Sequence, residues 1–384
     1  MLQNKIYQNF INEILKTFLL ILFGLTIIAW TVRAVNFLDL IVESGYSVST
    51  YFQYSFLNLF GILTKFIPLA FLLSLMIFIV NQIQEKEFLI LWTSGVKKIK
   101  IVNLFFFISI FILIFYLISS TLIAPFALNE SRTLIRENNF NSLLPTIRAQ
   151  QFSDSFTGFT FIVEKKSKNN VENIFIHDSS NTLKSLTSNK AKNISTTISA
   201  KNGVVEEKKM VLFDGKIISS SKDNIKNEII KFKQLNINLE NLTTGTIKQP
   251  KLQETSTFLL LQCMNDLVVG NVIDEDIGYC SKAAKKEITT VLNRRILLPL
   301  YIPIIALLCS FLLIKTKKQR NYFLNKYTIF ILSFLILLYA ELIVRYTGIS
   351  KTINILFAIS PLIFIPAIYI SLLLKLSKES VYNE

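Results

Sequence analysis

The stretch IVNLFFFISIFILIFYLISSTLIA, residues 101–124, contains no charged side chain. A helix of that length, rising about 1.5 Å per residue, crosses the roughly 30 Å hydrocarbon core of a bilayer. Two more apolar runs of this kind precede it, and three follow from Arg295. The pattern predicts a membrane α-helical protein with six transmembrane helices in a 3+3 arrangement. The expected spans are residues 14–36, 54–80, 101–124, 295–314, 327–345 and 353–374.

The chain between the two groups of spans is polar and has the pattern of short strands. Turn-forming residues, including KNG at 201–203 and DG at 214–215, are expected to separate these strands. Regular short strands favour a sandwich or jelly roll, so we predict an inserted, jelly-roll-like all-β domain. Alternating runs lie at 159–166, 172–178, 196–207, 209–218 and 228–240. The expected domains are an N-terminal membrane half (1–125), the β domain (126–268), a helical connector (269–294) and a C-terminal membrane half (295–384).

Charge is scarce and unevenly distributed. Charged residues make up 17% of the chain and hydrophobic residues 51%, and the net charge is +15. Residues 126–290 hold 22 Lys and Arg against 18 Asp and Glu, whereas the remainder holds 19 against 8. The surplus therefore belongs to the membrane part, where it reports topology and phospholipid headgroups rather than nucleic acid.

The short loops predict the orientation. Loops 81–100 and 315–326 are rich in Lys and Arg, whereas residues 37–53 contain neither. Positive residues favour the cytoplasmic side, so both termini are expected in the cytoplasm and the central domain outside it. In a Gram-negative cell the outside compartment is the periplasm, and the protein is expected in the inner membrane.

No catalytic motif or constellation is recognisable in the sequence. No GxxxxGK[S/T] loop for ATP and no GxSxG motif occurs, and His177 is the only histidine. We therefore expect a non-enzyme with no metal and no cofactor. Cys263 and Cys280 could pair in an oxidising compartment, although two unpaired structural thiols are the favoured interpretation.

The segment NQIQEKEFLILWTSGVKKIK, residues 81–100, predicts a short amphipathic helix on the cytoplasmic side. Its acidic residues would lie near the positive helix N-terminus, and Gly95 would end it in the left-handed conformation. Docking into a groove of a cytoplasmic partner and anchoring in the lipid interface both fit this pattern. The residues assigned to this site are Glu85, Glu87, Phe88, Leu91, Trp92 and Gly95.

The spacing E-x-x-x-L-x-x-x-G at Glu87, Leu91 and Gly95 resembles the coupling helix of the LptF/LptG permease family. IPLAFLLSL at 67–75 and RRILLPL at 294–300 extend the resemblance over nearly the whole chain. The segments NNFNSLLP, IFIHD and LFDGKII are closer to the F type than to the G type. One departure is Val291, because the family often has Glu four residues before the arginine that opens the fourth span.

The resemblance implies an inner-membrane permease subunit of the lipopolysaccharide exporter. Residues 82–95 would form the coupling helix, and Glu87 would contact the ATPase. The implied partners are a paralogous LptF/LptG permease, an LptB ATPase dimer, LptC with the periplasmic bridge, and lipopolysaccharide itself. ATP hydrolysis would take place in the separate ATPase chain.

Basic residues near the expected outer leaflet oppose the positive-inside trend. Guanidinium groups bind phosphates through paired hydrogen bonds, so these residues are candidates for contact with lipid A phosphates. Snorkelling to ordinary headgroups is the alternative. Lys65 lies within the second span and is expected to face a cavity or a partner. The candidate cargo residues are Arg33, Lys65, Arg294, Arg295, Arg345 and Lys351.

Two other functions remain open from the sequence. One is an export permease of the lipoprotein-release or macrolide type, although those usually place one span before the periplasmic domain and three after it. The other is a periplasmic scaffold or sensor that uses its helices only as an anchor.

Overall fold

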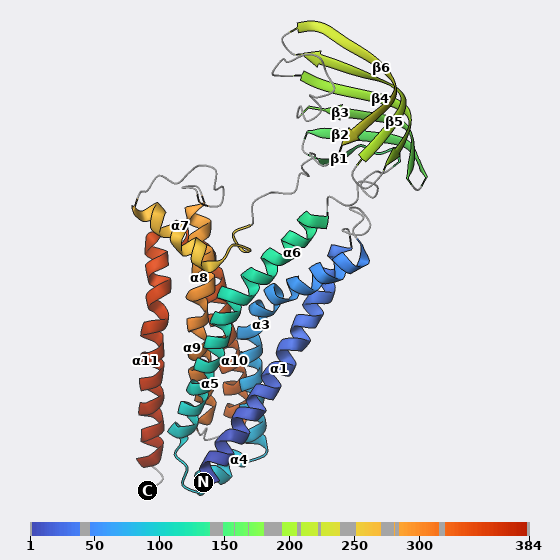
Figure 1. The fold of residues 1–384 in the computed structure, drawn as a ribbon. Helices are drawn as coiled ribbons and strands as arrows, with labels where there is room; N and C mark the ends of the chain where they lie inside the picture. The colour runs from blue at the N-terminus through green and yellow to red at the C-terminus, as the bar shows by residue number, and fades with distance from the viewer. Residues whose placement is uncertain are drawn as a thin grey trace. The chain divides into compact units, whose positions relative to one another are not determined.

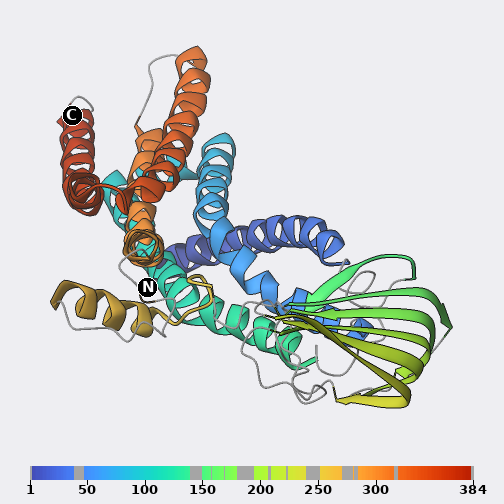
Figure 2. The same cartoon turned by 90° about the horizontal axis from the view of Figure 1, so that it is seen from above.

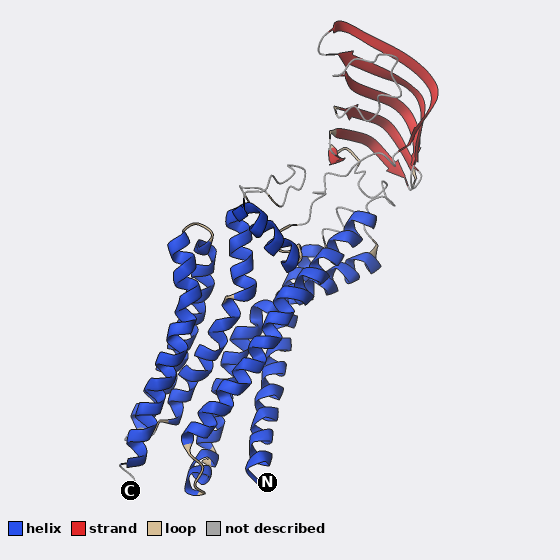
Figure 3. Ribbon diagram, turned by 60° about the vertical axis from the view of Figure 1, so that its left-hand side comes forward, coloured by secondary structure: helices blue, strands red, loops and turns tan. Residues whose placement is uncertain are grey.

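The computed structural model describes most of the 384 residues (Figures 1 and 3). The described ranges are 2–38, 47–138, 149–156, 158–167, 169–179, 194–205, 209–221, 224–238, 251–269, 280, 284–314 and 319–381. Two compact units form: residues Met1–Val32, Leu57–Asn129 and Gln249–Glu384 make a helical unit, and Arg33–Phe56 with Glu130–Lys248 make the second. Half of the predicted connector, 269–294, lies outside the described residues, namely 270–279 and 281–283.

Long apolar helices dominate the structure. Within the described residues, five helices are long and apolar enough to cross a membrane, or six if one bent pair is a single span. The helices are α1 (Leu2–Phe37), α3 (Val48–Gln84), α4 (Glu87–Thr93), α5 (Lys98–Ile118), α6 (Ala124–Asn138), α7 (Thr257–Val269), α8 (Lys285–Ile296), α9 (Ile302–Ser310), α10 (Gln319–Thr347) and α11 (Lys351–Val381). The chain is therefore a helical membrane protein that also carries a separate antiparallel sheet.

The bent pair differs from the straight span expected at 295–314. The helical path begins at Lys285 and turns by 42° between α8 and the segment that starts at Leu298. That segment opens as a 3-10 turn, η5 (Leu298–Tyr301), before α9. Pro299 cannot donate a backbone hydrogen bond to the carbonyl of Arg295, so the α-helical ladder breaks at this point.

The centre of the helical unit is α9. All nine of its residues are buried, and α5, α10 and α11 pack around it. Cross-helix hydrogen bonds add to the packing: the Tyr301 hydroxyl lies 2.6 Å from Ser360 Oγ, and Tyr369 donates to Asn103 Oδ1 at 3.0 Å. By contrast, α1, α10 and α11 are mostly exposed along their apolar lengths, as expected for lipid-facing or partner-facing helices.

The described strands form one six-stranded antiparallel sheet in the order β1-β2-β3-β4-β5-β6 (Figure 2). Each strand pairs with its neighbour in sequence, which is an up-and-down arrangement and not the crossed connections of the expected jelly roll. Only two residues separate β2 from β3 and β5 from β6, so those strands can only pair side by side. The strands are β1 (Ser153–Phe156), β2 (Phe159–Ser167), β3 (Asn170–Asp178), β4 (Ile194–Val205), β5 (Lys209–Ser221) and β6 (Asn224–Asn238).

A break in the ladder of paired residues runs across the sheet from β2 to β6, and the pairing register is the same on both sides of it. Each of these strands has one exposed residue that the ladder pairs skip. Beyond the break the alternation shifts by one, so Leu212 and Ile217 are both buried although an even spacing would be expected. The skipped residues are Glu164, Asn173, Lys201, Asp214 and Lys233.

The two turns expected at 201–203 and 214–215 are therefore absent. Both glycines lie inside strands, with Gly203 paired to Leu212 and Gly215 paired to Ala200 and Phe232. A Cβ on Gly203 would meet Ile174 Cδ1 at 2.6 Å, and one on Gly215 would meet the Ser199 carbonyl at 2.5 Å. The sequence places glycine at these positions because neighbouring strands approach closely, and not because the chain reverses.

Candidate functional site: a cationic cavity and the α4 helix

A cavity of about 470 Å³ lies within the helical unit. Its lining comes from α3, from the end of α5 through the start of α6, from α8 and the first residue of η5, from α10, and from Gln253 in the turn before α7. Four cationic side chains contribute to it, Lys65, Arg294, Arg295 and Arg345, against a single carboxylate, Glu341. A positive excess beside apolar helices calls for an anion, because unbalanced charge is costly at membrane depth.

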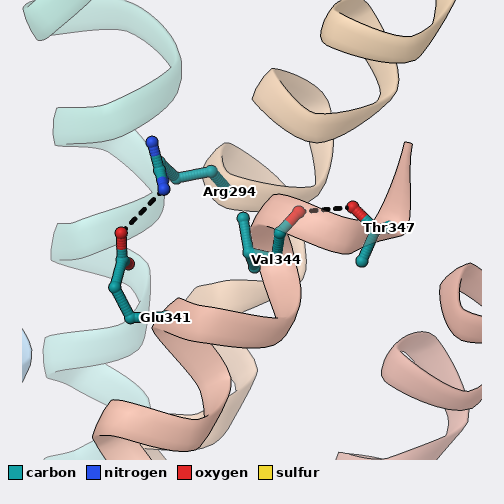
Figure 4. Close-up of polar contacts among 4 residues, drawn as sticks. All are labelled: Arg294, Glu341, Val344 and Thr347. Carbon is teal, nitrogen blue, oxygen red and sulfur yellow. Dashed lines mark hydrogen bonds and ion pairs between the residues drawn. The ribbon is translucent and has the colours of Figure 1, made fainter. Parts of the chain in front are cut away.

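Arg294 and Glu341 form an ion pair across the cavity (Figure 4). Arg294 Nη2 donates to Glu341 Oε1 at 2.7 Å, and the side chains are 35% and 45% exposed. Arg294 Nε is buried, and the structure gives it no hydrogen-bond partner. Glu341 therefore uses only part of the guanidinium donor set.

Arg295 is held differently, by the chain itself. It is 6% exposed and donates to the backbone carbonyls of Leu252, Gln253 and Thr255 and to Thr257 Oγ1. These four bonds, from 2.8 to 3.3 Å, tie the turn that precedes α7 to α8. The geometry corrects the expectation that Arg295 contacts cargo, because its donors already have partners.

Two prolines beside the cavity leave backbone carbonyls without their usual N–H donors. Side-chain hydroxyl groups donate hydrogen bonds to these carbonyls instead. Pro125 has no N–H for the Thr121 carbonyl, which instead accepts a 2.8 Å bond from Thr257 Oγ1. Pro299 leaves the Arg295 carbonyl free in the same way, and Ser120 Oγ donates to it at 2.9 Å. Ser120 lies in η1 (Ser119–Ile123), a π-helical turn between α5 and α6, so the bonds join three helical segments.

The other predicted cargo residues fall into two groups. Lys65 and Arg345 belong to the lining, in agreement with the expectation that Lys65 faces a cavity. Arg33, near the end of α1, and Lys351, at the start of α11, are exposed and are not lining residues. The sequence reasoning missed Glu341, although a lone carboxylate inside the predicted span 327–345 was a visible signal.

Val291 also lines the cavity, one turn before Arg294 and Arg295 on α8. The family resemblance implies a glutamate at this position. The carboxylate of this cavity comes from α10 instead, as Glu341.

The α4 helix ends as the sequence predicts. Gly95 has φ 87°, its N–H donates to the Trp92 carbonyl, and the Val96 N–H donates to the Leu91 carbonyl, both at 3.1 Å. These paired bonds make a Schellman motif, and they satisfy carbonyls that the last turn leaves open. At the other end Lys86 has φ 61°, which turns the chain from α3 into α4.

One face of α4 is buried against the chain's other helices, and the opposite face is exposed. Phe88 is 1% exposed and Leu91 9%, and the Phe88 ring packs against Phe10 of α1 and Phe78 of α3. Trp92 is half-buried and stacks on Phe88. This apolar face, which the sequence reasoning aimed at a partner or at lipid, instead contacts the chain's own helices. The face left open holds Glu87, Leu89 (51% exposed) and Ile90 (64% exposed), and Glu85 is exposed in the turn just before α4.

Cys263 and Cys280 form a disulfide. Their Cα atoms are 5.8 Å apart, within the range that a disulfide bridges. Leu260, Ile288 and Leu292 pack with them and bring α7 against α8. The pairing corrects the preference for two unpaired thiols, because spacing in the sequence could not show that these helices meet.

The described residues contain no group of three or more His, Cys, Asp and Glu side chains able to hold a metal. His177 lies in β3, and its Nδ1 is 2.9 Å from Thr197 Oγ1 of β4. The polar chemistry of the described structure therefore centres on the cavity and on α4.

The sequence was also compared with known proteins. The model of the family described as "Lipopolysaccharide export system permease LptF/LptG" matches residues 9–375. An uncharacterized protein of Rickettsia prowazekii (strain Madrid E) is 28% identical over 175 residues, which are 45% of this chain. The match spans about half, 48%, of that relative's length. The family is one of permeases and not of enzymes, and the apolar helices agree with a multi-pass inner-membrane protein. This chain belongs to the lipopolysaccharide export system permease family LptF/LptG.

Proposed function

We propose that this chain is one permease subunit of an ABC transporter that extracts lipopolysaccharide from the outer leaflet of the inner membrane. The cationic cavity carries the proposal, since it gathers positive side chains from three helices of an apolar bundle. Lipid A is anionic through its phosphates, and guanidinium and ammonium groups bind phosphate well. Lys65, Arg294 and Arg345 are the proposed contacts in the cavity, with Arg33 as a further contact at the end of α1.

The ATPase is proposed to dock on the open face of α4. Packing of Phe88 and Leu91 on α1 and α3 means that a push on α4 reaches the membrane helices directly. Glu85 and Glu87 would meet basic residues of an LptB subunit, and Leu89 and Ile90 would enter its groove. Glu87 is exposed in the first turn of α4, which favours an acidic side chain.

The assembly follows from the orientation that the loops predict. Counting α8 with α9 as one span gives a 3+3 arrangement with both termini cytoplasmic and the β domain periplasmic. The exposed lengths of α1 and α10 would face a paralogous permease. Among the described strands β6 pairs only with β5, so its outer edge could add a strand from LptC or a neighbouring β domain. The apolar face of the sheet would receive acyl chains.

A pull-down of the tagged chain tests the ATPase contact. Wild type, Glu87→Arg and the matched control Glu172→Arg, an exposed residue of β3, would be purified in detergent and their partners identified by mass spectrometry. We expect an ABC ATPase and a second permease with wild type and control, and loss of the ATPase alone with Glu87→Arg. A chain that purifies alone, or partners indifferent to residue 87, would favour an anchored scaffold.

Crosslinking tests the cavity. A photoreactive amino acid at Leu338, which lines the cavity on α10, should crosslink to lipopolysaccharide in living cells. Lys65→Gln combined with Arg345→Gln should reduce the crosslink several-fold. The control Lys285→Gln, an exposed cation on α8 outside the lining, should leave it unchanged. Equal crosslinking in all variants would remove the cavity from the transport path.

A further inference from the structure

Glu341 is the one acidic residue in a lining with four cations. It lies on α10 six residues before that helix ends, in a segment otherwise rich in apolar residues. A carboxylate in an apolar segment is energetically costly, so its presence there suggests a function. Among the described residues its ion-pair partner is Arg294, at 2.7 Å through a single pair of atoms.

The contact with Glu341 leaves the Nε donor of Arg294 unused. Nε and Nη2 of an arginine lie on one edge of the planar group and together bind two oxygens of a phosphate or carboxylate. Glu341 takes Nη2, while Nε is buried and has no partner in the structure. A buried donor left without an acceptor destabilises the state that contains it. A ligand with two suitable oxygens would satisfy both donors.

We propose that Glu341 is a displaceable counter-ion, and that a phosphate group takes its place on Arg294 with a two-point contact. The ligand class is a phosphate monoester or diester, carried by a lipid headgroup or free in solution. The proposal rests on the proposed function, because it assigns a binding step to the same cavity. It adds that the site has two states, with Glu341 on Arg294 when empty and phosphate on Arg294 when loaded.

The competing carboxylate has a consequence for release. A site with four cations and no internal anion would hold phosphate tightly and give it up slowly. Glu341 stabilises the empty state by pairing with Arg294, so a phosphate must displace this carboxylate before it binds Arg294. Glu341 thus sets the affinity at a level that permits turnover.

Binding by the purified full chain in detergent micelles would test the proposal. The probes are bis-phosphorylated lipid A, the same lipid after phosphatase treatment, and inorganic phosphate, each followed by native mass spectrometry. Glu341→Gln should bind phosphorylated lipid A roughly three- to ten-fold more tightly than wild type. Arg294→Gln should bind it more weakly by a similar factor. The double variant should match Arg294→Gln, because Glu341 acts through Arg294.

A relocation variant tests whether a carboxylate beside Arg294 sets the affinity, whichever helix carries it. Val291 lines the same cavity one turn before Arg294, and a glutamate there lies at helical spacing from that arginine. Val291→Glu with Glu341→Gln should return the affinity to the wild-type value. Competition by inorganic phosphate that equals competition by the lipid would identify free phosphate as the ligand source, and weaker competition identifies the headgroup.

The outcomes separate the two proposals. If wild type binds phosphorylated and dephosphorylated lipid A equally, both the phosphate site and its cargo role fail. If wild type prefers the phosphorylated lipid but Glu341→Gln binds it no more tightly, the cargo role stands and the displaceable counter-ion is overturned. Tighter binding that persists in the double variant would also overturn it, since the effect would not pass through Arg294.

Discussion

The carbonyls of Thr121 and Arg295 show how single residues shape the cavity wall. Each lacks its usual N–H partner because a proline lies four residues later, and each accepts a hydroxyl from another segment. A freed carbonyl in an apolar bundle would be costly without such a partner. The two prolines can therefore interrupt the backbone ladder without leaving these carbonyls unsatisfied.

Removing the Ser120 hydroxyl should show how much stability depends on its bond to the Arg295 carbonyl. Ser120→Ala leaves the buried Arg295 carbonyl without its cross-helix donor, and we expect a loss of about 1–3 kcal/mol. Ser74→Ala is the matched control, because that buried serine donates only to Phe71 on its own helix. Thermal unfolding of the detergent-purified chain would compare them. Equal stability of the two variants would mean that the Arg295 carbonyl does not need Ser120.

Gly348, directly after α10, permits the backbone there to lie close to α8. A Cβ there would collide with the Lys286 carbonyl of α8 and lie 2.7 Å from Thr290 Oγ1. Gly348→Ala should cost about 1–3 kcal/mol through overpacking and should shift α8, which carries Arg294.

Gly24 provides the matched control for that substitution. It lies on α1 with nothing within 4 Å of a built Cβ. Gly24→Ala should be neutral or stabilising by up to about 1 kcal/mol, since alanine favours a helix over glycine. A thermal shift of the same sign and size in both variants would contradict the close approach at Gly348.

At the scale of elements, the β strands show where sequence patterns succeed and where they fail. The five predicted strands all appear, because alternating apolar residues report one buried face. The glycines at 203 and 215 were interpreted as turns, since local sequence cannot distinguish a chain reversal from a close approach between strands. The short β1 has too few residues for a pattern. The long helices were easier to predict, because runs of apolar residues leave few alternatives.

The break in the ladder of paired residues in β5 lies at Asp214, which has an unusual backbone angle. Its φ is 49°, in the left-handed region that aspartate tolerates and β-branched residues do not. Asp214→Val should therefore destabilise the sheet by about 1–2 kcal/mol, while Asp214→Gly should cost far less. Protease resistance of the β domain within the full chain would report the difference. Valine and glycine variants of equal resistance would contradict the strained angle.

The two faces of α4 make separable predictions. Phe88→Ser removes a buried aromatic side chain that packs on Phe10 and Phe78, and it should cost about 3–5 kcal/mol in stability. Ile90→Ser changes an exposed side chain, so stability should hold while recovery of the ATPase in a pull-down falls. A stable Phe88→Ser chain, or an Ile90→Ser chain that keeps its ATPase, would reverse the assignment of the faces.

At the scale of the whole molecule, the sequence could place spans and loops but not the cavity. Its lining comes from five stretches of chain that lie up to 284 positions apart, from Gly61 to Arg345. Hydropathy assigns each stretch to a helix and says nothing of which faces converge. Lys65 was anticipated because a charge within a span must face something polar. The structural use of Arg295 was not, since its carbonyl partners form a turn with no sequence signature.

The Cys263–Cys280 disulfide offers a test of the proposed orientation of the whole chain. Disulfides persist in the periplasm and are rare in the cytosol, so this bridge favours a periplasmic location for the α7 end of the helical unit. In intact cells, maleimide–polyethylene glycol should modify neither cysteine until a membrane-impermeant reductant is added, and then it should modify both. Cys309 is buried in α9 and should stay unmodified without denaturant, which makes it an internal control. Reporter fusions at residues 45 and 200 should give periplasmic signals, and those at 90 and 320 cytoplasmic signals. Two thiols that react only after the cells are permeabilised would put the α7 end in the cytoplasm and invert the proposed topology.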